Sequence, residues 1–158
     1  MAHAILSASS AHRWTQCPVS VQHEGGDEEP SSAVAAEGTL AHKLADDYLR
    51  GKKWPVLGST HEVDGHTFTL DSDFLDNVRS YTDYVQTRRW VGGFTPDSEV
   101  NYSRLLEVPY ASAWGTSDCC GWIELPSGER GLLVIDLKFG RRAVSPVGNA
   151  QGMMYAAG

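Results

Sequence analysis

Cysteine is scarce in this sequence, and its spacing excludes two common classes of small protein. The 158 residues include three cysteines, of which Cys119 and Cys120 are adjacent, and there is no C-x-x-C pair. An odd number of cysteines does not make a disulfide framework, and a structural zinc site needs paired ligands at short spacing. We therefore expect neither a disulfide-stapled protein nor a zinc finger.

Long apolar segments are also missing. A membrane-spanning helix needs roughly 18 consecutive apolar residues, and no such run occurs. The first residues, 1–7, lack the basic start and apolar stretch of a secretion signal. The sequence thus predicts a cytoplasmic protein with no membrane partner.

An excess of basic residues is the third absence. The chain has 13 lysines and arginines against 20 aspartates and glutamates, a formal net charge of −7. Proteins that coat DNA through its phosphates usually carry a basic excess, so this class is disfavoured. A nuclease remains compatible, because bound cations then supply the positive charge. Of the basic pairs Lys52-Lys53, Arg88-Arg89 and Arg141-Arg142, we interpret the first two as solvated surface.

The residues that are present can build one hydrophobic core. Apolar residues make up 41% of the chain, and the aromatic residues include five tryptophans and six tyrosines. This length and composition predict a single compact domain over residues 1–158.

Two helices are predicted in the first half. Over residues 38–49, apolar side chains recur at helical spacing, and Gly51 is a plausible stop. A second helix is expected over residues 71–90. Asp71 would cap its N-terminus, and one face would carry Phe74, Val78, Tyr81 and Val85.

Strands are predicted in the second half, over residues 99–106, 115–125 and 131–139. Residues 126–129, Pro-Ser-Gly-Glu, form a good hairpin turn between the last two. The continuous apolar run over 132–135 suits a strand covered on both faces in the middle of a sheet. A last helix is expected from about Asn149, so the fold class is α/β, with helices on a small mixed sheet.

Three charged side chains stand out at the predicted strand ends. Residues two apart in a strand point the same way, so Asp136 and Lys138 would project together. Pairing with the preceding strand would bring Asp118 close to Asp136. Two carboxylates with waters and a carbonyl make an oxygen-rich site for Mg²⁺ or Mn²⁺. Such a cation activates water for attack on a phosphodiester, and Lys138 would place the water or stabilise the developing charge.

Four short motifs occur in order along the chain: Gly38-Thr39-Leu40-Ala41-His42, Gly115-Thr116-Ser117-Asp118, Ile135-Asp136-Leu137-Lys138-Phe139-Gly140, and Gln151 with Tyr155. This order resembles the RecB-like branch of the PD-(D/E)XK nucleases. The N-terminal run Leu6 to Ser10, with Trp14 and Cys17-Pro18, also looks like this branch, and more closely like a phage-associated family of unassigned function.

The resemblance implies a restriction-endonuclease-like fold and a metal-dependent deoxyribonuclease, with DNA as substrate and exonuclease action expected. It makes Asp118 and Asp136 metal ligands, His42 a ligand or neighbour of the metal, and Lys138 catalytic. The resemblance also places Gln151 among the catalytic residues. Tyr155 and Glu37 are further candidates. Glu37 would fall on the apolar face if the first helix extends back that far, and a carboxylate there needs a cation or a hydrogen-bond partner. The implied location is a bacterial host or phage-infected cell.

Two other interpretations are open. A non-catalytic protein could keep the nuclease fold to bind DNA or a protein partner, and a zinc-binding regulator could use His42, His61, His66 and the cysteines. The superfamily core also has a final strand after its last helix, and we expect this strand to be missing here. An unpaired sheet edge would invite a homo-oligomer, unless charges such as Arg104 and Glu107 protect it.

Overall fold

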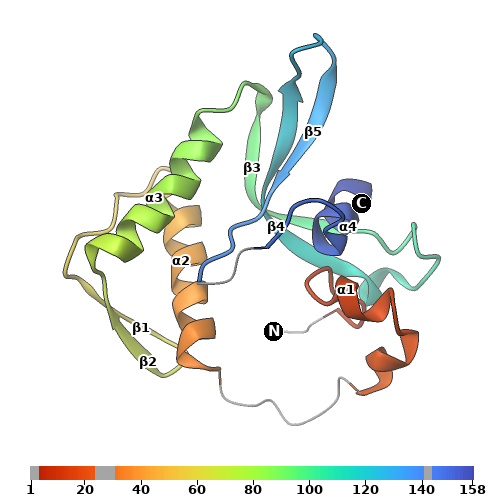
Figure 1. The fold of residues 1–158 in the computed structure, drawn as a ribbon, viewed down its shortest axis with the longest axis horizontal. Coiled ribbons are helices and arrows are strands. Elements are labelled where there is room, and N and C mark those ends of the chain that lie inside the picture. Colours follow the sequence, from red (N-terminus) through yellow and green to blue (C-terminus); the bar gives the residue numbers. More distant parts are fainter. Residues whose placement is uncertain (1–3, 24–30, 141–143) are drawn as a thin grey trace. The chain divides into compact units, whose positions relative to one another are not determined.

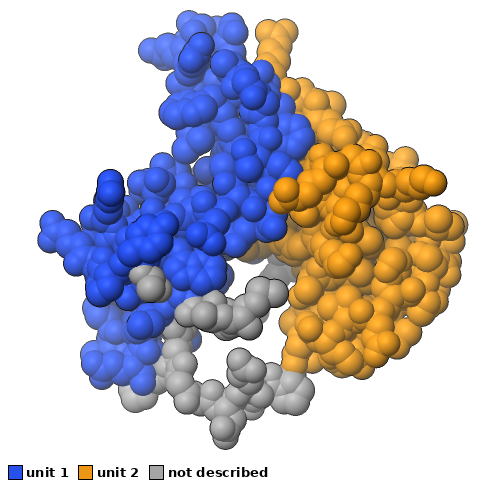
Figure 2. All heavy atoms as spheres, turned by 180° about the vertical axis from the view of Figure 1, so that it is seen from behind, with its two compact units in different colours: residues 1–28, 90–136, 144–158 blue, residues 29–89, 137–143 orange. Residues whose placement is uncertain are grey.

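The computed structural model describes residues 4–23, 31–140 and 144–158. They group into two units, each built from separate stretches of chain (Figure 1, Figure 2). Unit 1 comprises Met1–Glu28, Trp90–Asp136 and Val144–Gly158, and unit 2 comprises Glu29–Arg89 and Leu137–Ala143. Helices and antiparallel strands occur in both, which confirms the α/β class.

Helix α2 of unit 2, Ala33–Leu49, is longer than the predicted helix over 38–49. It begins five residues earlier because Ser32 caps it, its hydroxyl accepting a bond from the Ala35 amide at 3.2 Å. Gly51 follows the helix with φ +86°, as expected of a C-terminal stop. Its buried residues are Ala36, Leu40, Ala41, Leu44 and Ala45. Tyr48 and Leu49, which the predicted apolar stripe also includes, are only half-buried.

Helix α3, Ser72–Gln86, packs against α2 and begins where the sequence predicts. The Asp71 carboxylate accepts a hydrogen bond from the Phe74 amide at 2.8 Å. Phe74, Val78, Tyr81 and Val85 are all buried, which confirms the predicted face. The helix ends at Gln86 rather than near Trp90, because Trp90 already belongs to the next strand.

A short hairpin in unit 2 was not predicted. Strands β1, Thr60–Val63, and β2, His66–Thr69, pair antiparallel and contact α2. Between them Asp64 and Gly65 have φ of +50° and +78°, the left-handed conformation of a two-residue turn. The Asp-Gly dipeptide was the available signal in the sequence.

The sheet of unit 1 has the order β3-β4-β5, with β3 at Trp90–Asn101, β4 at Trp114–Glu124 and β5 at Arg130–Ile135. It is antiparallel rather than mixed, because consecutive strands pair directly without a crossover. The first strand was wrongly placed at 99–106: it starts at Trp90 and carries Gly92 and Gly93 inside it, in an irregular stretch where both have positive φ.

Strand β5 was wrongly expected in the middle of the sheet. It is the outer strand of the three, and Leu132 is 41% exposed. Leu132 lies opposite Trp122, which is 53% exposed, so the apolar run reflects a cross-strand pair rather than burial on both faces. The predicted turn before β5 is confirmed, with Gly128 at φ +83° and its amide bonded to the Leu125 carbonyl.

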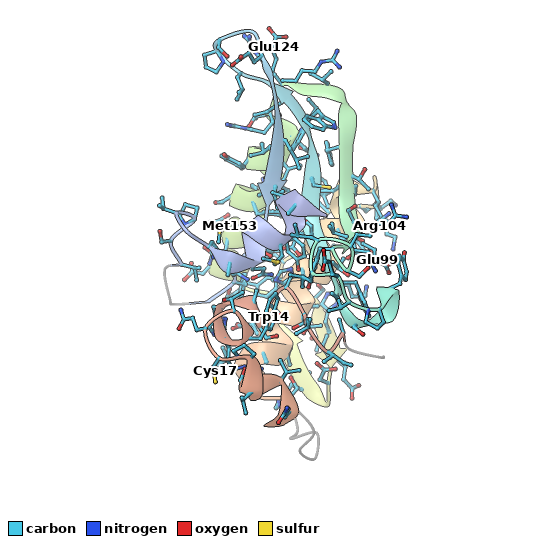
Figure 3. All side chains as sticks on the ribbon, turned by 90° about the vertical axis from the view of Figure 1, so that its right-hand side faces the viewer. Trp14, Cys17, Glu99, Arg104, Glu124 and Met153 are labelled. Carbon is cyan, nitrogen blue, oxygen red and sulfur yellow. The ribbon has the colours of Figure 1, made fainter. Side chains whose placement is uncertain are left out.

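Short helices complete unit 1. They are α1 at Ala11–Trp14, η1 at Pro18–His23, η2 at Tyr110–Ser112 and the predicted C-terminal helix α4 at Ala150–Ala157. Seen from the side, Met153 of α4 lies between Trp14 of α1 and Glu124 at the hairpin end (Figure 3). The core of this unit joins α1, the sheet and α4: Ala8, Ala11, Trp14, Val100, Tyr102, Ala113 and Tyr155. Across the described ranges, no helix is both long and apolar enough to cross a membrane.

Candidate functional site

The register of the β4–β5 hairpin sets the positions of the two predicted acidic residues. Cys120 pairs with Val134 and Cys119 with Ile135. Extending this register by one position places Asp118 opposite Asp136, the first residue after β5. Side chains at opposite positions point to the same side, with Cβ atoms about 4.5–5.5 Å apart. The two carboxylates, separated by the whole hairpin in sequence, are therefore a candidate acid pair.

Helix α4 contributes a third polar side chain to this pair. Its N-terminus is capped by Asn149, whose side-chain oxygen accepts a bond from the Gly152 amide at 3.0 Å. Two residues after this cap, the Gln151 amide nitrogen donates to Asp136 Oδ1 at 2.9 Å and to the Tyr155 hydroxyl at 3.4 Å. The amide thus orients one carboxylate of the pair, as second-layer groups do at metal sites.

Tyr155 is buried beside the acid pair. Burial raises the pKa of its hydroxyl above the ordinary value, the charges of Asp136 and Asp118 raise it further, and the bond from Gln151 lowers it. Both aspartates thus lie near enough to act on this hydroxyl, which stays protonated at neutral pH. Tyr155 also explains Gly115, because a Cβ there would lie 3.0 Å from Tyr155 Cε1.

The residues on either side of Asp118 are firmly held. Ser117 and Cys119 are completely buried, and the Ser117 hydroxyl donates to the Cys119 carbonyl at 3.3 Å. Burial raises the pKa of the Cys119 thiol to about 12, so this group remains neutral near the acid pair. Cys17, Cys119 and Cys120 are all free cysteines.

The other predicted site residues belong to unit 2. Glu37 and His42 are half-buried on α2. Since α2 extends back to Ala33, Glu37 does fall on the row that continues through the buried residues Ala41 and Ala45. His42 lies at the edge of that stripe, as the helical spacing predicts.

Lys138 is exposed and lies beyond the end of β5. Strand β5 ends at Ile135 rather than near Phe139, so Asp136 and Lys138 both lie just beyond it, and their expected alignment stays a prediction. Covalent geometry alone still keeps the two Cα atoms within about 7 Å of each other, the span of two residues.

The donor set of the acid pair suits a hard cation. Carboxylate oxygens are the preferred ligands of Mg²⁺ and Mn²⁺. Within the described residues of unit 1 there is no ready-made group of three histidine, cysteine, aspartate or glutamate side chains. A cation at the pair would thus complete its shell with waters or backbone carbonyls, as Mg²⁺ commonly does.

Comparison with known proteins gives the family of this chain. No solved structure matches it, and the resemblance to RecB-like nucleases stays a prediction. The family described as "Protein of unknown function (DUF2800)" matches residues 3–158, and the chain belongs to that family.

Proposed function

We propose that this protein is a metal-dependent deoxyribonuclease that hydrolyses phosphodiester bonds, acting as an exonuclease. Asp118 and Asp136 hold Mg²⁺ or Mn²⁺, which supplies an activated water and neutralises charge on the phosphate oxygens. Gln151 fixes the orientation of Asp136. Lys138 places the water or stabilises the charge that develops on the phosphate.

The observation that supports the proposal is that polar residues from separate motifs, on the β4–β5 hairpin and on α4, lie close together. Hairpin register brings Asp118 opposite Asp136, and α4 adds Gln151 through a 2.9 Å hydrogen bond. Two carboxylates this close repel each other unless a cation or a proton lies between them. If Asp136 only belonged to a surface ion pair, it would not need an amide and a buried tyrosine from a separate helix beside it.

Glu37, His42 and Lys138 enter the proposal by resemblance. His42 is a further ligand or a neighbour of the cation, Glu37 is a secondary candidate, and Tyr155 contacts the site or the DNA. These roles are predictions, and each can be tested by a single substitution in the cleavage assay described below.

The decisive experiment incubates end-labelled linear DNA and circular DNA with Mg²⁺ or Mn²⁺. We expect the parent chain to degrade linear DNA only, and Asp118→Ala and Asp136→Ala to be inactive. Asp76→Ala is the matched control, since it removes an exposed carboxylate on α3. Calorimetry with Mn²⁺ should show binding that both site variants lose and the control keeps.

Other outcomes separate the alternatives. Binding of DNA by the parent without any cleavage would favour a non-catalytic protein with a nuclease fold. Retention of Mn²⁺ affinity by Asp118→Ala and Asp136→Ala would show that the cation site is wrongly placed. Stoichiometric zinc in the purified protein would favour the zinc-binding regulator instead.

A further inference from the structure

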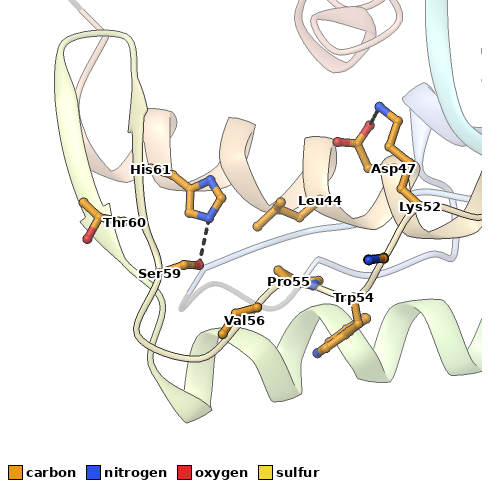
Figure 4. A pocket seen from close by; sticks show the side chains of 10 residues that line it. Leu44, Asp47, Lys52, Trp54, Pro55, Val56, Ser59, Thr60 and His61 are labelled. Atoms are coloured by element: carbon orange, nitrogen blue, oxygen red, sulfur yellow. Dashed lines mark hydrogen bonds and ion pairs between the residues drawn. The ribbon is translucent and has the colours of Figure 1, made fainter.

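Unit 2 contains a pocket of about 350 Å³ between the end of α2, the loop after it and the start of β1 (Figure 4). Small-molecule sites typically enclose about 300–1,000 Å³, so the volume suits a compact ligand. The lining residues are Leu44, Asp47, Lys52, Lys53, Trp54, Pro55, Val56, Ser59, Thr60 and His61.

One part of the lining is apolar and held in place. Leu44 of α2 is buried, and Trp54 and Pro55 follow in the loop. The Trp54 ring meets Tyr48 edge-on at 4.8 Å, and the Arg79 guanidinium lies 4.7 Å from its centre. These contacts fix the indole before any ligand arrives, which lowers the entropic cost of binding.

The other part of the lining is cationic. Lys52 donates to Asp47 Oδ1 at 2.6 Å, and Lys43, outside the pocket, donates to Asp47 Oδ2 at 3.1 Å. The Lys52 bond is the main reason why the pKa of Asp47 lies below its usual value. Lys53 forms no ion pair with any residue in the described part of the chain. The pocket lining thus contains two lysines and one carboxylate, whose charge is already balanced by its bonds to Lys52 and Lys43. This basic excess is local, since the net charge of the chain is −7.

Polar groups complete the pocket on the side of β1. The Ser59 hydroxyl and His61 Nε2 lie 3.0 Å apart, and Thr60 is next to both in the chain. Hydroxyl groups and an imidazole can both donate and accept hydrogen bonds. A ligand with an apolar flat part, a polar edge and an anionic group would satisfy the whole lining.

We propose that this pocket binds one nucleotide, with its phosphate at Lys52 and Lys53 and its base against the wall of Leu44, Trp54 and Pro55. Ser59 and His61 contact the edge of the base or the sugar. An anionic lipid would match the lysines, but its acyl chains could not form hydrogen bonds with these polar groups. The inference goes beyond the acid pair and rests on the proposed function only for the choice of DNA as the source of the nucleotide.

The test measures binding of labelled oligothymidylate to the full chain by fluorescence anisotropy, with EDTA present so that no DNA is cut. We expect the double variant Lys52→Gln, Lys53→Gln to bind about tenfold more weakly or worse, because charge-assisted contacts are lost. The slope of log affinity against log salt should fall by about 0.7 for each lost contact.

Lys43→Gln is the matched control. Lys43 and Lys52 bond to the same carboxylate and are equally exposed, at 63%, but only Lys52 lines the pocket. Parental affinity in Lys43→Gln supports the pocket, while a loss equal to that of the double variant would mean unspecific attraction and overturn it. The binding assay does not depend on cleavage. If the acid pair is inactive, only the cleavage assay fails, and if the pocket binds no nucleotide, only the binding assay fails.

Competition experiments identify the source of the nucleotide. Displacement of the oligonucleotide by thymidine monophosphate, but not by thymidine or inorganic phosphate, means that the pocket takes free nucleotides as well as strands. Displacement by unlabelled oligothymidylate alone assigns the pocket to a strand. Lysine-dependent binding of phosphatidylserine vesicles with no oligonucleotide binding contradicts the proposal.

Discussion

At the scale of single residues, two glycines of the motifs have opposite roles. A Cβ on Gly115 would lie 3.0 Å from Tyr155 Cε1 and 3.2 Å from the Ala8 side chain, and both neighbours are buried. A Cβ on Gly38, inside α2, would meet nothing within 4 Å. A methyl group at the first position would force its neighbours to shift, whereas the second glycine only weakens its helix.

We therefore predict opposite effects of alanine at these positions. Gly115→Ala should lower the free energy of unfolding by about 1–3 kcal/mol through overpacking. Gly38→Ala should raise it by about 1 kcal/mol, the difference in helix propensity. Urea denaturation of both variants measures this. A Gly115→Ala protein as stable as the parent would show that Tyr155 is not packed against that strand.

Lys138 provides the second prediction at this scale. The side chain is exposed and lies beyond β5, so its removal should leave folding and Mn²⁺ binding unchanged. If it stabilises charge on the phosphate, Lys138→Ala should abolish cleavage or slow it at least about 100-fold. Lys138→Arg should rescue this only in part, because the guanidinium has a different shape. Parental cleavage rates in Lys138→Ala would remove the catalytic assignment.

At the scale of elements, helix caps allow a test of how α4 supports the acid pair. Asn149 caps α4 and Asp71 caps α3 in the same way, each by one bond to a backbone amide. Replacing either by alanine should cost about 1 kcal/mol of stability. Only Asn149→Ala should also weaken Mn²⁺ binding, because α4 carries Gln151 and its bond to Asp136.

The measurement combines denaturation with calorimetry on the two cap variants. Equal losses of stability with a selective loss of Mn²⁺ affinity in Asn149→Ala support the role of α4. The same Mn²⁺ affinity in both variants would indicate that the helix does not position the carboxylate.

At the scale of the whole molecule, the chain passes between its two units repeatedly. Unit 1 takes residues from both ends and the middle of the sequence, and unit 2 takes the stretches between them. Unit 1 joins three separate stretches, so it forms only when the loops that run through unit 2 are closed. We therefore predict that the two fold as one cooperative domain, as the length of the chain suggests.

Two spectroscopic signals can test this cooperativity. The long helices α2 and α3 of unit 2 should dominate the far-ultraviolet circular dichroism. Four of the five tryptophans, Trp14, Trp90, Trp114 and Trp122, report on unit 1 by fluorescence. Both signals should change at the same urea concentration, and two separate midpoints would contradict a single domain.

The outer strand β5 leads to a prediction about self-association. Its Leu132 and the opposite Trp122 form an exposed apolar pair on the sheet. An outer strand with exposed apolar side chains favours pairing with another chain, and a lysine on that strand opposes such pairing. Light scattering over a dilution series should show a mass that falls toward the monomer. Leu132→Lys should be monomeric throughout, unlike the control Val34→Lys at an exposed position of α2. A parent that is monomeric at every concentration would exclude this association.

Local physical rules were enough to predict much of this protein from its sequence. The cap at Asp71, the buried face of α3, the turn at Gly128 and the helix after Asn149 all depend on residues close together in the chain. The candidate acid pair was also predictable, because a hairpin turn determines which residues of its two strands face each other.

The tertiary structure decided the features that depend on distant contacts. An apolar run does not show whether neighbours cover a strand, so β5 was expected in the centre and lies at the edge. The need for glycine at position 115 arises from Tyr155, forty residues later in the chain. The lysine pair at 52 and 53 looked like plain surface, and it lines a pocket only because the unpredicted hairpin of β1 and β2 folds beside α2.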